Sequence, residues 1–149
     1  MNRTSTAIIP ALTPGTVHYN FTAHQKLKVM NLQQTEDVAV TTVLTEEGFR
    51  NGVMPRAQLS ILASQLAVDK ATQKNAKEFA GFELEEAIAV VKVLTDAGTT
   101  VTTPGKNDMA FIEQLKAASG SEFDKLYMYA ELTNHEFLRD LAKSYLESA

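Results

Sequence analysis

The chain contains no cysteine among its 149 residues. This absence excludes disulfide bonds, thiolate metal sites, iron–sulfur clusters and cysteine nucleophiles. It does not indicate a compartment, because cysteine-free proteins occur in oxidising and in reducing spaces. Any metal site must therefore be built from oxygen and nitrogen ligands.

Clustered positive charge and long apolar runs are also missing. The net charge is −4, and the densest basic group is only Lys26 with Lys28, which argues against general nucleic-acid binding. No apolar run approaches the roughly 18–20 residues that span a bilayer. With 44% hydrophobic and 21% charged residues, the chain has the composition of one globular domain that can bury a sizeable core.

Signatures of common catalytic sites are absent as well. The sequence has no glycine-rich loop for phosphate, since Gly48, Gly52 and Gly81 are isolated. It has no Gly-x-Ser-x-Gly elbow and no His-Glu-x-x-His helix. The sequence alone therefore names no activity.

Amphipathic helix patterns are present from residue 45 onwards. They predict four helices, which run from Thr45 to about Lys70, from Gln73 to Ala97, from about Asn107 to Ala118, and from Ser121 to about Glu147. The expected fold is all-α, an up-down four-helix bundle. A three-helix bundle remains if the third segment is only a connection.

Helix ends have their own signals. Pro55 predicts that the first helix either kinks or restarts. Thr72 is expected to cap the second helix, and Gly98 is placed to end it. Ser121 with Asp124 approximates a capping box for the last helix.

The second helix is expected to be the central one. Its predicted inward stripe consists of Phe79, Phe82, Ala87, Val90 and Leu94. Two carboxylates, Glu83 and Glu86, fall on or beside that stripe. Charges in a core must be paired, protonated, bound to metal or turned to the rim.

Residues 1–44 are the least regular part and are interpreted as an N-terminal arm, followed by the bundle domain at 45–149. We expect the arm to pack on its own bundle or on a neighbouring copy, which would give a homo-oligomer. His18 and His24 are expected to be solvated there. The apolar run Ala7–Leu12 is shorter than a signal-peptide core, so the protein is either cytoplasmic or a chain whose leader has been removed.

Several residues in fixed order resemble a known family. They are Phe49, Leu66–Ala71, Phe79-Ala80, Gly98, Gly120, Phe123-Asp124, Tyr127 and His135. The pattern resembles small bacterial exported proteins of unknown function with a ferritin-like four-helix bundle, often labelled outer-membrane proteins. The resemblance implies a ferritin-like four-helix bundle and a periplasmic or extracellular location. It does not indicate a biochemical activity. Members commonly carry Asp-His about seven residues after Phe-Ala, where this chain has Glu86 and Ala87.

A metal site inside the bundle is the sharpest chemical hypothesis. Glu83-x-x-Glu86 and Glu131-x-x-x-His135 each place two ligand types on one helix face, a set that suits Fe, Mn or Zn. Ferritin-like di-iron proteins use Glu-x-x-His on two helices and one Glu on each of two others. That pattern is incomplete here, because the second helix lacks histidine and the first offers only Gln58 and Gln65.

The simpler interpretation is hydrogen bonding without metal. Glu83 or Glu86 would then lie at a partly buried rim position and hydrogen-bond to Tyr127, Asn134, His135 or a lysine. In either case we expect one of these acids within about 8 Å of His135, the reach of a one-water bridge.

Three functions follow from these patterns. The first is a non-enzymatic exported bundle protein that acts through interaction or a structural or stress role. The others are a ferritin-like metal-binding or metal-dependent redox protein, and a self-assembling protein that uses residues 1–44.

Overall fold

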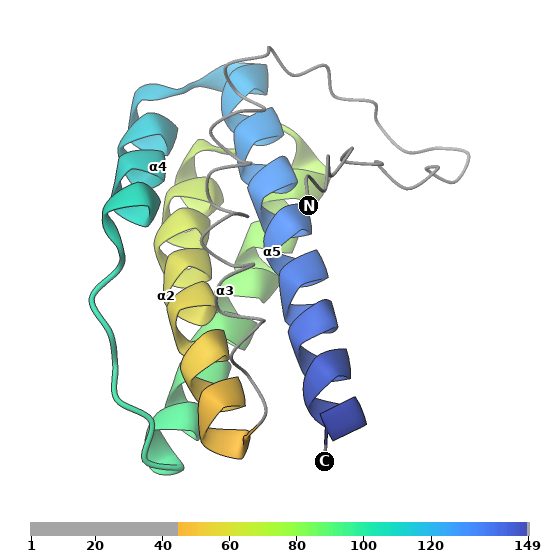
Figure 1. The fold of residues 1–149 in the computed structure, drawn as a ribbon. Coiled ribbons are helices and arrows are strands. Elements are labelled where there is room, and N and C mark those ends of the chain that lie inside the picture. The colour runs from red at the N-terminus through yellow and green to blue at the C-terminus, as the bar shows by residue number, and fades with distance from the viewer. Residues whose placement is uncertain (1–44, 149) are drawn as a thin grey trace, which may run out of the picture.

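A computed structural model describes residues 45–148, which form four α-helices (Figure 1). They are α2 (Glu46–Lys70), α3 (Lys74–Asp96), α4 (Lys106–Ala117) and α5 (Gly120–Ser148). The described residues contain no strand. The all-helical prediction is confirmed for this part of the chain, and the third segment is a helix. The predictions for the N-terminal arm, with His18 and His24, lie outside the described residues.

The start of α2 follows the sequence signal. The Thr45 hydroxyl accepts a hydrogen bond from Gly48 N at 3.0 Å, and two glutamates occupy the first turn. An oxygen at the N-cap and acids beside it satisfy the free amides and the helix dipole. The helix continues through Pro55, so the predicted restart is wrong.

The start of α3 is capped in a different way from the prediction. Gln73, not Thr72, is the N-cap residue. Asp124 of α5 accepts hydrogen bonds from Thr72 N at 2.9 Å, from the Thr72 hydroxyl at 2.5 Å and from Gln73 N at 3.0 Å. The expected capping box of the last helix is therefore wrong, because the Asp124 carboxylate reaches across to another helix.

The end of α3 is as predicted. Gly98 has a positive φ of 92°, a conformation that glycine adopts without the Cβ penalty. Its amide bonds Thr95 O at 2.9 Å, and the Thr99 amide bonds Leu94 O at 2.9 Å. These two bonds form a Schellman motif, which satisfies the last carbonyls of the helix.

The helix α2 contacts all three others (Figure 1) and runs in the opposite direction to α3 and α5. Its most extensive contacts are with α3, where small residues of both helices are buried. These are Ala63, Ala67 and Ala71 on the side of α2, and Ala76 and Ala80 on α3. The short α4 packs against α2 and α5. Within the described range, every helix is too short or too polar to cross a membrane.

The predicted inward face of α3 is partly wrong. Ala87 and Leu94 are buried, but Phe82 is 74% exposed and Glu83 is only 6% exposed. Because α2 presents alanines to α3, the two backbones approach closely and small side chains fill the contact. A phenylalanine at that contact would separate the helices, so the inward stripe includes Glu83 and leaves Phe82 outside.

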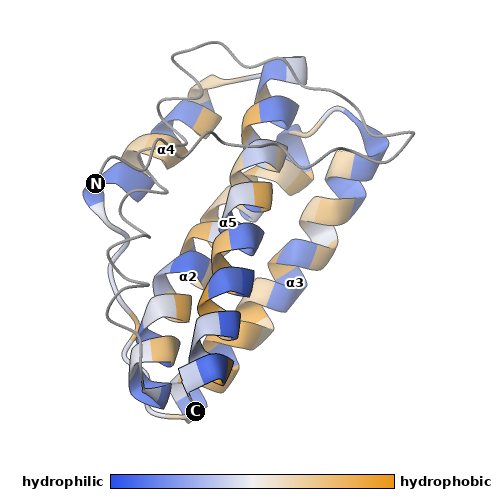
Figure 2. Cartoon of the chain, turned by 45° about the vertical axis from the view of Figure 1, so that its right-hand side comes forward, coloured by the Kyte–Doolittle hydropathy of each residue, from blue (hydrophilic) through white to orange (hydrophobic). Residues whose placement is uncertain are grey.

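The core consists of two apolar clusters. Hydrophilic and hydrophobic residues alternate along each helix, as Figure 2 shows. The larger cluster contains Leu59, Ala63, Ala67, Ala71, Ala76, Ala80, Phe111, Ile112, Leu115, Phe123, Leu126, Tyr127 and Ala130. The smaller cluster contains Phe137 and Leu141, with Phe49, Val53 and Leu138 packed against them. Buried polar residues lie where the two clusters adjoin: Arg56 and Ser60 on α2, and Glu131 and Asn134 on α5. We call these, together with Glu83 and His135, the polar layer.

Candidate metal centre

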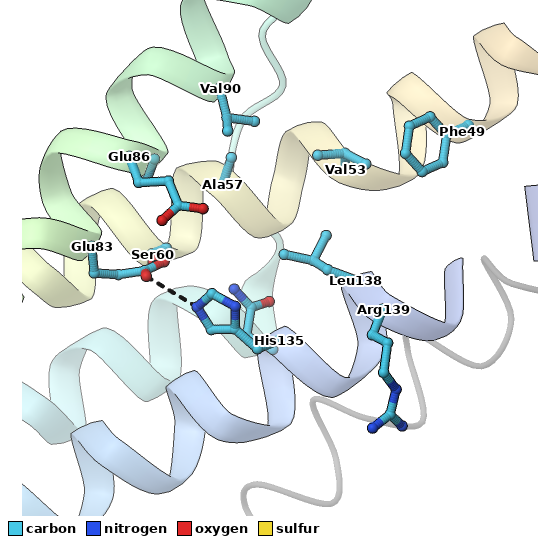
Figure 3. A pocket seen from close by; sticks show the side chains of 12 residues that line it. Phe49, Val53, Ala57, Ser60, Glu83, Glu86, Val90, His135, Leu138 and Arg139 are labelled. Atoms are coloured by element: carbon cyan, nitrogen blue, oxygen red, sulfur yellow. Dashed lines mark hydrogen bonds and ion pairs between the residues drawn. The ribbon is translucent and has the colours of Figure 1, made fainter. Parts of the chain in front are cut away.

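Three helices meet in the polar layer around the side chain of Ser60 on α2. The Ser60 hydroxyl lies 2.7 Å from Glu83 Oε1, and 3.0 and 3.1 Å from the two carboxylate oxygens of Glu131. On the other side, Glu83 Oε2 lies 3.0 Å from His135 Nε2 (Figure 3). One ligand atom from each of Glu83, Glu131 and His135 can be chosen so that all lie within 4.8 Å of one another.

The hydrogen bonds around Ser60 imply a proton on Glu131. A hydroxyl has one hydrogen, so Ser60 can donate to only one carboxylate at a time. The second contact is satisfied when Glu131 is protonated and donates to Ser60, while Ser60 donates to Glu83. The pKa of Glu131 fits this arrangement, because burial and then the negative charge of Glu83 raise it to about 8, against the opposing effects of Ser60 and His135.

Glu83 and His135 form a charged pair. The hydrogen bond to Glu83 raises the pKa of His135 above its usual value, although burial acts in the opposite direction. Burial works to raise the pKa of Glu83, but the hydrogen bonds from His135 and Ser60 and the imidazolium charge outweigh it, and the net pKa is lowered. The His135 side chain is 42% exposed and that of Glu83 only 7%, so the pair opens to solvent at the histidine.

The sequence-based candidates have separate outcomes. Glu83, Glu131 and His135 lie together, and Glu83 falls well inside the expected distance from His135. Glu86 is exposed and does not belong to this cluster. Gln65 is exposed, and Gln58 accepts a hydrogen bond from the Thr102 hydroxyl at 2.8 Å, so neither residue reaches the cluster.

Sequence reasoning missed the two serines through which α2 takes part. Ser60 joins both glutamates, and Ser64 lies 2.8 Å from the Tyr127 hydroxyl. The two serines are four residues apart, so they share one helix face, which is the only signal that marks them in the sequence. Tyr127 therefore pairs with α2. Among the partners that the hydrogen-bonding interpretation offered for the acids of α3, Glu83 contacts His135.

A pocket of about 370 Å³ opens beside the cluster (Figure 3). Its apolar lining comes from α2, α3 and α5, and consists of Phe49, Val53, Ala57, Ala87, Val90 and Leu138. Its polar lining is Ser60, Glu83, Asn134 and His135, with Glu86 and Arg139. A pocket of this size, with an apolar wall and a few convergent polar groups, is typical of small-ligand sites.

Asn134 adds an unsatisfied acceptor to the pocket lining. Its Nδ2 donates to Arg56 O at 3.3 Å, which fixes the orientation of the amide. Its Oδ1 is buried and has no hydrogen-bond partner among the described residues. Buried polar atoms without partners are rare in folded proteins, and each one calls for an explanation.

The family was found by comparison with family profiles. Residues 29–149 match the profile of a domain of unknown function, DUF4142. The match begins inside the segment that we assigned to the N-terminal arm. No curated protein and no solved structure matches the chain. The family description names neither a ferritin-like fold nor an outer-membrane location, so both stay predictions. Because the match covers most of its length, the chain belongs to the DUF4142 family, a family whose function is unknown.

Proposed function

We propose that this protein binds one divalent transition-metal ion through Glu83, Glu131 and His135. The observation that carries the proposal is the convergence of these three side chains, with ligand atoms within 4.8 Å of one another. Ligands around an ion with bonds of about 2.1 Å lie roughly 3–4 Å apart. Small side-chain movements would therefore bring the three into the first coordination sphere.

The electrostatics of the cluster favour a cation. Two carboxylates lie beside the same hydroxyl, and one of them must hold a proton, as the raised pKa of Glu131 of about 8 indicates. A divalent ion replaces that proton and the proton on His135, because metal ligands must be deprotonated. Metal binding should therefore release protons, and affinity should rise with pH.

The ligand set favours a single site for Zn²⁺, Fe²⁺ or Mn²⁺. One imidazole and two carboxylates suit these ions, and Zn²⁺ binds such ligands more tightly than Fe²⁺ or Mn²⁺. A di-iron site of the ferritin type needs carboxylates from all four helices. Here α2 supplies Arg56 and Ser60 to the polar layer and no carboxylate, so we propose a mononuclear site rather than ferritin-like redox chemistry.

Elemental analysis and calorimetry test this proposal. Protein freed of metal with a chelator and then dialysed should take up one equivalent of Zn²⁺. Glu83→Gln should weaken binding at least tenfold, since removal of even an outer-shell partner costs 10–100-fold. Glu85→Gln is the matched control, because Glu85 is an exposed acid of the same helix that neither belongs to the cluster nor lines the pocket, and it should bind as the wild type does.

Two results would contradict the metal proposal. One is the absence of stoichiometric binding by folded wild-type protein. The other is an equal loss of affinity in Glu85→Gln and Glu83→Gln, which would indicate general attraction of cations to an acidic surface. Circular dichroism of each variant shows whether the helices are retained.

A second candidate is an exported, non-enzymatic role in protein interaction. Three large apolar side chains on α3 are solvent-exposed, Phe82 at 74%, Val93 at 66% and Ile88 at 51%, and a partner protein that covered them would remove apolar surface from water. The family resemblance and the antiparallel course of α2 and α3 support a ferritin-like bundle of this kind. Fractionation of the source cells tests the location, and recovery of the chain only from the cytoplasm would contradict export.

A further inference from the structure

The pocket beside the metal ligands extends well beyond what a single ion needs. Its volume is about 370 Å³, and Glu83 and His135 lie at its polar end. In Figure 3, Val53 and Phe49 continue away from this end along α2, with Leu138 on α5 facing them. The pocket is therefore an apolar channel that ends at the proposed metal ligands.

Three protein ligands leave coordination positions open. Metal sites that act on other molecules typically keep such a position, whereas structural sites close it with a fourth ligand. On α3, Ala87 lies one helical turn after Glu83 and lines the same pocket with only a methyl group. The side of the site toward Ala87 is therefore left free for an external molecule.

Asn134 specifies a second property of that molecule. Its Oδ1 is a buried acceptor without a partner among the described residues, and the side chain lines the pocket. A small turn of the Asn134 side chain would bring this acceptor to the pocket wall, where an N–H or O–H beside the metal-binding oxygen of a bound molecule would satisfy it. A simple carboxylate or phosphate ester offers only acceptors there, and its charge would also face Glu86.

We propose that the pocket binds a small molecule with a metal-coordinating oxygen, an adjacent N–H or O–H donor, and a compact apolar body. This inference rests on the proposed metal site. The head group coordinates the ion and donates to Asn134 Oδ1. The apolar body lies against Val53, Phe49 and Leu138. Hydroxamic acids carry these three features and serve as probes.

Three hydroxamates separate the features on wild-type protein. Cobalt(II) is loaded in place of the natural ion, because its visible absorption responds to a change of ligand. Benzohydroxamic acid should bind about tenfold more tightly than acetohydroxamic acid, because its ring buries more apolar surface. N-Methylbenzohydroxamic acid keeps both oxygens but lacks the N–H, and should bind about tenfold more weakly than benzohydroxamic acid.

Two variants then locate the apolar body. Val53→Trp should fill the channel and weaken benzohydroxamate at least tenfold, while cobalt loading is retained. Val93→Trp is the matched control, because Val93 is on α3 outside this pocket, and it should leave probe binding unchanged. If Val53→Trp fails to fold, the comparison of the three probes on wild-type protein still decides.

The failures of the two proposals are distinguishable. If cobalt does not bind to the folded protein, the metal proposal is wrong and this inference is wrong with it. If cobalt binds but the three probes bind equally or not at all, only the inference is overturned. Removal of cobalt by the probes, measured in the protein after desalting, would also overturn it, because no ternary complex would exist.

Discussion

Replacing Glu131 with glutamine should change how the stability of the metal-free protein depends on pH. Glu131 is 3% exposed, its Oε2 lies 3.0 Å from the Ser60 hydroxyl, and the negative charge of Glu83 acts on it. Its pKa is raised from 4.5 to about 8. Glutamine has nearly the shape of the protonated acid and cannot ionise, so Glu131→Gln removes the titration and little else.

The sign follows from the two pKa values. Between pH 4.5 and about 8 the folded chain holds a proton on Glu131 that the unfolded chain has released. The unfolded state therefore binds fewer protons in this window, and the free energy of unfolding falls as pH rises. Each unit of pKa difference corresponds to about 1.4 kcal/mol. The full shift thus predicts a loss on the order of 3–5 kcal/mol, developed between pH 5 and pH 9.

The neighbouring pair contributes pH dependence of its own. His135 has a raised pKa, so its contribution is present below its unfolded value of 6.5 and is lost as pH rises through the folded value. Glu83 has a lowered pKa, so its contribution is present above 4.5 and is lost as pH falls. Glu83 and His135 both remain in Glu131→Gln. The difference in free energy of unfolding between the wild type and this variant therefore reports mainly on Glu131.

Urea unfolding followed by circular dichroism, with EDTA present at pH 5, 7 and 9, measures these free energies. At pH 5 the two proteins should agree within about 1 kcal/mol, since a hydrogen-bonded amide replaces a hydrogen-bonded acid. At pH 9 the variant should be more stable by several kcal/mol. Glu85→Gln, at an exposed position outside the cluster and the pocket, should follow the wild type throughout. Parallel curves for wild type and Glu131→Gln would refute the assignment of a buried, protonated acid.

Three further substitutions test the fold and the site. Asp124→Ala should cost about 3 kcal/mol or more in urea unfolding, because the donors at the start of α3 lose a buried charged acceptor. Gly81→Ala should raise the free energy of unfolding by about 0.5–1 kcal/mol, because Gly81 lies inside α3 and an added Cβ would meet no atom within 4 Å. An unchanged or lower free energy of unfolding would contradict this. Ala87→His should tighten Zn²⁺ binding about tenfold or more in calorimetry, since it adds a ligand one turn from Glu83 and beside His135, and weaker binding would place the ion elsewhere.

Local signals in the sequence predicted the helices well but their faces less well. Each end of α2, and the end of α3 at Gly98, depends on residues within one turn, so the pattern could be read directly. The inward face of α3 depends on what opposes it. The alanines of α2 bring the helices close and turn Phe82 outward, and no pattern within α3 alone contains that information.

The cap at α3 shows the same limit. Asp124 is 51 residues from Gln73 in the chain, and the sequence placed it in a local capping box with Ser121. Its three acceptor bonds to the start of α3 arise only when α5 packs beside the α2–α3 turn. Local capping rules predict that a short polar side chain hydrogen-bonds to the backbone of its own helix. Tertiary packing can place the same side chain at the end of another helix.

Three of the four candidate site residues, Glu83, Glu131 and His135, lie together as the sequence suggested, whereas Glu86 does not, and the residues around them could not be predicted. The spacing of Glu131 and His135 puts both on one face, and an acid on the central helix was an evident partner. Ser60 and Asn134 carried no such signal, although they decide what the cluster can do. Ser60 contacts both carboxylates, while burial and the charge of Glu83 raise the pKa of Glu131 so that it keeps a proton, which a cation can replace. In the sequence, Ala87 stands where a histidine ligand would be needed, which argues against a di-metal centre. In the structure Ala87 lines the pocket. A methyl group at this position leaves a coordination position of the proposed ion free.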